Sequence, residues 1–104
     1  MKVLMHLIEK AYDTLDEVEE YTIQAMHLKT THKSLSEVYI KIAEEHIGIF
    51  KMLHDEMGNL IEEEKRNGKM PSAEMLAIYN YEHERIIKEF NENKLRMEEY
   101  KKMY

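Results

Sequence analysis

The sequence has no cysteine, no tryptophan, one proline and three glycines in 104 residues. Without cysteine the chain forms no disulfide, offers no thiolate nucleophile and builds no cysteine-type zinc site. Because proline and glycine are scarce and the composition does not change along the chain, we expect a single domain over residues 1–104. Uninterrupted apolar runs are only a few residues long, which argues against a transmembrane helix.

Positive charge is also scarce. The 21 acidic residues outnumber the 15 lysines and arginines, so the formal net charge is −6. Nucleic-acid binding depends on neutralising phosphates, so this charge argues against a nucleic-acid partner. An acidic face could instead meet a basic protein, or imitate nucleic acid to one; the alternative is an ordinary solvated surface. The opening MKVLMHLIEKAYD carries charged residues early and has no cleavage site; it does not read as a signal peptide, and we expect a cytoplasmic protein.

What the sequence does contain is long helical periodicity. In the first third of the chain, apolar or small residues recur at alternating spacings of four and three, which predicts a heptad seam in a left-handed bundle. The middle third carries a broader apolar stripe, so we expect other helices to cover that helix on more than one side. The predicted seams are Leu4, Ile8, Ala11, Leu15, Val18, Thr22 and Ala25, followed by Tyr39, Ile42, His46, Ile49, Leu53, Met57 and Leu60.

Two short polar stretches separate the helical segments. KTTHK at residues 29–33 is short enough to join two antiparallel helices. NGKMPS at residues 67–72 supplies Gly68 to end one helix, Pro71 to prevent its continuation and Ser72 to cap the next. Both stretches therefore predict tight turns.

The predicted architecture follows from these segments. Ser34 and Glu37 fit a capping box at the start of the middle helix. The sequence predicts an all-α fold of three long antiparallel helices, at about 2–28, 35–66 and 73–102, in an up-down-up bundle. The apolar positions of the third helix are Met75, Leu76, Tyr79, His83, Ile86, Ile87, Phe90, Met97, Tyr100 and Tyr104.

The chain has nine methionines and seven tyrosines, and several of them lie outside the predicted buried seams. Both residue types are adaptable and common at interfaces. We therefore expect a homo-oligomer, such as a dimer that completes a four- or six-helix bundle; the alternative is that these side chains thicken a monomeric core. The residues off the seams include Met26, Met70, Tyr81, Tyr100 and Met103.

One candidate metal site combines Glu17 with Glu45 and His46. Antiparallel pairing about the first turn places Glu45 and His46 opposite Glu17. A carboxylate from one helix and a carboxylate–imidazole pair from the next are the ligand types of diiron and dimanganese bundles. The alternative is that His46 is a packed histidine, hydrogen-bonded to a neighbour.

A second candidate site combines Glu9, His54 and His83. The same pairing argument brings His54 near Glu9 across one interface and near His83 or Glu84 across the other. Imidazoles that converge from separate helices suit zinc or another late transition metal. Here too the alternative is a packed pair, and a histidine-based pH sensor is a third interpretation.

The established catalytic motifs are absent from the sequence. No histidine has a glutamate three residues before it, although dinuclear bundles require that Glu-x-x-His pairing. HExxH, a glycine-rich phosphate loop and a Ser-His-Asp group with a usable nucleophile are also missing. We therefore expect a protein that is not an enzyme.

The segment Ile42–Met57, IAEEHIGIFKMLHDEM, resembles the second helix of ferritin-like proteins of the rubrerythrin and manganese-catalase kind. Their pattern is an acidic pair, then Glu-x-x-His, then an apolar-Leu ending. The resemblance implies that the first two helices form one ferritin-like hairpin, with Glu17 or Glu20 as the first-helix carboxylate and Glu45 as a second.

The same alignment shows where the chain departs from that family. Aligned on Met52–His54, the family's glutamate falls on His46 and its histidine on Ile49. An isoleucine cannot ligate a metal, so the resemblance supports the fold and argues against dinuclear chemistry. The whole chain also resembles small phage and prophage proteins of unassigned function, through the MHLIEKA opening and the MLH segment.

Two functional hypotheses follow. The first is a small acidic, non-enzymatic helical protein of phage or prophage type, acting in the host cytoplasm through self-association and protein–protein contact. It would serve as an assembly accessory or as an inhibitor of a basic host protein, without a cofactor, a membrane or a nucleic acid. The alternative is a ferritin-like protein that binds iron, manganese or zinc at a degenerate carboxylate–histidine site.

Overall fold

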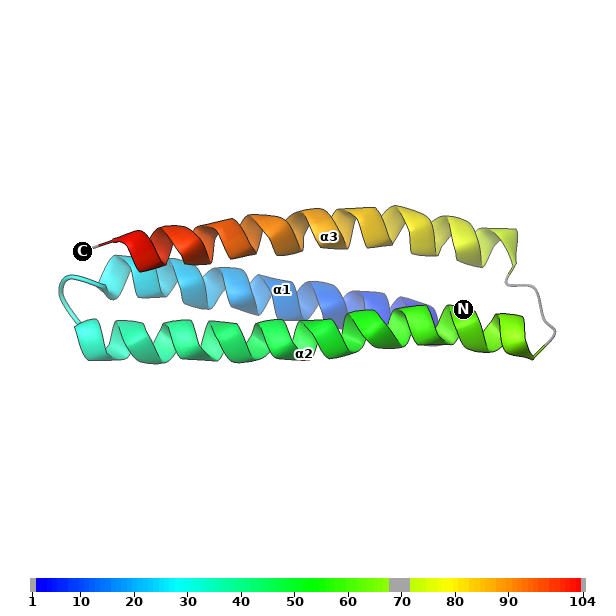
Figure 1. Cartoon of the computed structure of the whole chain (residues 1–104), viewed down its shortest axis with the longest axis horizontal. Coiled ribbons are helices and arrows are strands. Elements are labelled where there is room, and N and C mark those ends of the chain that lie inside the picture. Colours follow the sequence, from blue (N-terminus) through cyan, green and yellow to red (C-terminus); the bar gives the residue numbers. More distant parts are fainter. Residues whose placement is uncertain (1, 68–71, 104) are drawn as a thin grey trace.

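A computed structural model describes residues 2–67 and 72–103 as three long helices (Figure 1). They are α1, Lys2–Leu28; α2, Lys33–Arg66; and α3, Ala73–Lys102. The helices lie side by side in an up-down-up arrangement, forming a rod of 57 × 18 × 17 Å. The predicted all-α fold is confirmed. Within the described ranges, no helix has the length and apolar character needed to cross a membrane.

The predicted seam of α1 is confirmed in full. All seven of its residues are buried, because α2 covers one side of the seam and α3 the other. The central positions Leu15 and Val18 are at most 1% exposed. Strict heptad spacing therefore identified the buried face of this helix residue by residue.

The predicted buried seam of α2 is wrong, because it is rotated around the helix relative to the residues that are buried. Of its seven residues only Met57 is buried, and Ile49 is 46% exposed. Apolar side chains cover more than one side of α2, so more than one stripe satisfies helical spacing. The true core stripe also uses small residues that carry little hydrophobic signal. The buried residues are Ser36, Ile40, Ala43, Phe50, Met57 and Ile61.

Of the helix caps predicted from the sequence, the structure confirms one and contradicts another. The Ser72 side chain accepts a hydrogen bond from the backbone N–H of Met75 at 3.0 Å, as predicted for a cap. The capping box at Ser34 is wrong, because α2 already begins at Lys33 and its N-cap residue, His32, makes no side-chain cap bond. Gly68 and Pro71 lie outside the described residues.

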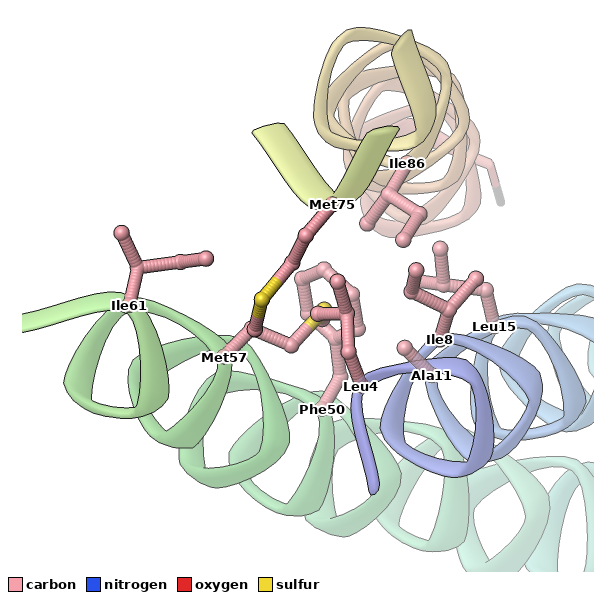
Figure 2. Close-up of a cluster of buried hydrophobic side chains, with 9 residues drawn as sticks. All are labelled: Leu4, Ile8, Ala11, Leu15, Phe50, Met57, Ile61, Met75 and Ile86. Atoms are coloured by element: carbon pink, nitrogen blue, oxygen red, sulfur yellow. The ribbon is translucent and has the colours of Figure 1, made fainter. Parts of the chain in front are cut away.

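Two clusters of buried side chains form the core. Figure 2 shows Met75 reaching from α3 toward Met57 of α2, while Ile86 points toward Ile8 and Leu15 of α1. The first cluster comprises Leu4, Ile8, Ala11, Leu15, Phe50, Met57, Ile61, Met75 and Ile86. The second, nearer the first turn, comprises Val18, Ala25, Ile40, Ala43, Met97 and Tyr100.

The three helices do not pack equally. The backbone of α1 follows α2 closely along its length and α3 less closely, whereas α2 and α3 approach each other at very few points. On that side, long ring-bearing side chains span the wider gap, such as the stacked Phe50 and Phe90. The α1–α2 pair is thus the tight part of the bundle, and the α2–α3 side is the open part.

Candidate functional site

A continuous stack of five rings bridges α2 and α3, and we call it the ring stack. Its rings are, in order, Phe90, Phe50, His54, His83 and Tyr79. Successive ring centroids are 5.0, 5.9, 4.9 and 5.5 Å apart, within the range of favourable aromatic pairing. Phe50 and His54 come from α2, and the other three rings come from α3, so the stack joins the two helices.

The two histidines at the centre of the ring stack are directly bonded. The Nε2 atoms of His54 and His83 lie 2.8 Å apart, so one nitrogen donates a proton and the other accepts it. Asp55 Oδ1 is 3.9 Å from His54 Nδ1, and the His54 side chain remains 29% exposed. The predicted meeting of His54 and His83 is therefore confirmed.

His83 is held in its neutral form. Burial lowers its pKa below the ordinary 6.5, and the neighbouring charge of His54 lowers it further. The carboxylate of Glu84 acts in the opposite direction and offsets these two effects only in part. A neutral imidazole keeps a lone pair available for a proton or a metal ion.

His46 makes a different kind of contact. Its Nδ1 lies 2.9 Å from the backbone carbonyl of Ile42, and because a carbonyl can only accept, Nδ1 carries the proton. The centroid of its ring lies 5.8 Å from the centroid of the Tyr21 ring. His46 and Glu17 line the same open depression between α1 and α2, whereas Glu45 is exposed and lies outside it.

Neither predicted three-residue metal site forms as a unit. Within residues 2–67 and 72–103, no group of three or more histidine, aspartate or glutamate side chains is arranged to hold a metal ion. Of the first set, the structure brings Glu17 and His46 to one depression. Of the second it brings His54 and His83 together, while Glu9 is exposed on α1.

A polar seam between α1 and α3 escaped the sequence analysis. The Tyr12 hydroxyl donates to Glu82 Oε2 at 2.5 Å, and burial, followed by the Glu82 carboxylate, raises the pKa of Tyr12. Burial also raises the pKa of Glu89, and the nearby Asp16 raises it further. Glu82 and Glu89 occupy inward heptad positions together with Ile86, so spacing from Ile86 was the signal that could have identified them.

A second polar cluster ties the three helices together near the first turn. Ser36 Oγ donates to the carbonyl of Ala25 at 2.6 Å and lies 2.9 Å from the Tyr100 hydroxyl. Lys29 Nζ donates to the Tyr100 carbonyl and lies over the Tyr100 ring, 4.3 Å from its centroid. These bonds satisfy buried polar groups, and we assign them a structural role.

The outer side of α2 carries apolar side chains that nothing in the described chain covers fully, and we call it the α2 strip. Its members recur at helical spacings and are Leu35, Val38, Ile42, Ile49 and Met52. Met52 is 69% exposed, and Ile42 is the only half-buried member. The α2 strip includes two residues that the sequence analysis assigned to the core seam, Ile42 and Ile49.

In comparisons with known proteins, the chain matches no protein-family model, no curated protein and no solved structure. The three-helix all-α architecture is seen directly in the structure. What the protein does must accordingly be argued from its own side chains.

Proposed function

We propose that this is a small non-enzymatic helical protein that acts through self-association and protein–protein contact, with the α2 strip as its contact surface. The observation that carries the proposal is the exposure of the strip. Four of its five side chains are exposed, although they belong to a helix whose opposite side fills the core. Exposed apolar side chains that recur along one side of a helix can mark an interaction site.

A second copy of the chain fits the strip. If two α2 helices pack antiparallel about a two-fold axis, the strip pairs with itself, with Leu35 opposite the second copy's Met52 and Val38 opposite its Ile49. Glu45, which interrupts the strip, then lies opposite the second copy's Ile42, with Lys41 next to that position. The apolar pairs toward the two ends of the strip favour this arrangement.

Contact with a different protein is the second part of the proposal. The net charge of −6 favours a basic partner. The resemblance to phage and prophage proteins supports a setting in which such a protein assists assembly or inhibits a basic host protein. In either role the dimer would present its acidic outer surface to the partner.

The test is the oligomeric state of three proteins by light scattering and sedimentation equilibrium. We expect wild type to form a dimer, Met52→Glu to be monomeric, and Leu95→Glu to remain a dimer. Leu95 is the matched control because it is 61% exposed on α3, so a new carboxylate there meets no proposed interface. A monomeric wild type at about 0.5 mM, where contacts of even weak affinity are populated, would refute the proposal, as would equal behaviour of the two variants.

A further inference from the structure

We propose that His54 and His83 form a binding site for one late divalent transition-metal ion, of the nickel(II) or copper(II) class, that joins α2 to α3. The site has two imidazole ligands and takes its remaining ligands from water. It is independent of the α2 strip, which lies on the outer side of α2 and contains neither histidine.

The spacing of the two nitrogens carries the proposal. The Nε2 atoms are 2.8 Å apart and come from different helices. Metal–imidazole bonds are about 2.0–2.1 Å long, so two nitrogens at 90° around one ion lie about 2.9 Å apart. To bind an ion, the donor histidine would shift its proton from Nε2 to Nδ1, and both rings would rotate until their Nε2 lone pairs point about 45° away from the line that joins the two nitrogens. A tetrahedral ion requires about 3.3 Å and hence a wider opening.

The rings are already held near this geometry. The Phe50 ring packs on His54 with 5.9 Å between centroids, and the Tyr79 ring packs on His83 at 5.5 Å. Asp55 lies beside the far nitrogen of His54, at 3.9 Å from Nδ1.

The access of the pair also suits a metal ion. The 29% exposure of the His54 side chain gives water and ions a path to the pair. Imidazole nitrogen without thiolate favours nickel, copper and zinc over magnesium or calcium.

The consequence for the fold is a cross-link at its most open side. The backbones of α2 and α3 rarely approach each other, and the ring stack is one of the side-chain contacts that join them. An ion bound to both histidines would exist only in the folded chain, so it must stabilise the native state. Metal binding should therefore raise the melting temperature and slow the opening of α3.

Nickel(II) alone is the probe that tests the site. We expect wild type to bind one nickel ion per chain in a calorimetric titration and to melt at a higher temperature with nickel than without it. His54→Gln and His83→Gln should each bind roughly tenfold or more weakly and lose the shift. His6→Gln is the control, since His6 is exposed on α1 and should leave both quantities unchanged.

Wild-type protein also gives a direct readout that does not depend on the folding of any variant. Substoichiometric nickel should broaden the ring-proton NMR signals of His54 and His83 before those of the other four histidines. The proposal is overturned if wild type binds no nickel at millimolar concentration, if His46 or an exposed histidine broadens first, or if folded His54→Gln and His83→Gln variants bind like wild type.

Discussion

The two sides of α2 are built by different means. Toward α1, small and aliphatic residues form a heptad seam, with Leu15 in one buried cluster and Ala43 in the other, and the two backbones run close together. Toward α3, five rings span a wider gap, and two of them are histidines. The comparison shows where stability and chemistry reside: the α1–α2 pair provides the rigid platform, and the α2–α3 side holds the groups that can titrate or ligate.

Side-chain truncations on the two sides of α2 should give the largest changes in the free energy of unfolding. Leu15→Ala removes a fully buried side chain from the α1 seam, and we expect it to lower the free energy of unfolding by about 3 kcal/mol. Phe90→Ala removes a half-buried ring from the ring stack and should cost less, about 2 kcal/mol. Urea denaturation measures both, and a larger loss for Phe90→Ala would reverse the comparison.

Acid should weaken the α2–α3 side selectively. Because the pKa of His83 is lowered in the folded state, the unfolded chain binds more protons between that lowered value and 6.5. The free energy of unfolding therefore falls as the pH drops below 6.5, by less than about 1 kcal/mol because the ring retains contact with water. The groups facing His83 are His54 and Tyr79, with Glu84 beside it on α3.

Denaturation curves taken at several pH values between about 7.5 and 5, where histidine titrates, measure this effect. His83→Gln should remove most of the slope, whereas His6→Gln should retain it. An unchanged slope in folded His83→Gln would show that other groups cause the pH dependence.

A substitution of Glu89, which lies on the α1–α3 side, should give the smallest change in the free energy of unfolding. Burial, and then Asp16, raise its pKa, so the native state disfavours the ionised carboxylate and gains stability relative to the unfolded chain as the pH falls toward 4.5. Glu89→Gln should therefore stabilise the protein at pH 7 by about 0.5 kcal/mol, a small value because the group is half exposed. Thermal unfolding measures the gain, and the exposed Glu92→Gln should give a smaller one.

The sequence predicted the parts of the fold that one pattern controls. The α1 seam was predicted in full because α2 and α3 together cover both of its heptad positions. Antiparallel pairing about the turns predicted that His54 and His83 would meet, since side chains at matching distances from a turn face each other.

The remaining details depended on tertiary contacts that periodicity does not encode. The broad apolar surface of α2 fits two stripes, and only the position of α3 decides that Phe50 is buried while Ile49 is exposed. Asn93 points inward and its amide donates to the Leu15 carbonyl on α1, and Glu89 is partly buried near Asp16 of α1. The polarity of both residues hid them from a search for apolar positions.

Native-state hydrogen exchange by NMR tests most directly whether α3 is held less firmly than the α1–α2 pair. The account predicts that central amides of α3 exchange through openings of lower free energy than those of α1 and α2, because the backbone of α3 lies less close to α1 than that of α2 does and approaches α2 at very few points. Equal protection of all three helices, with exchange only through global unfolding, would contradict it.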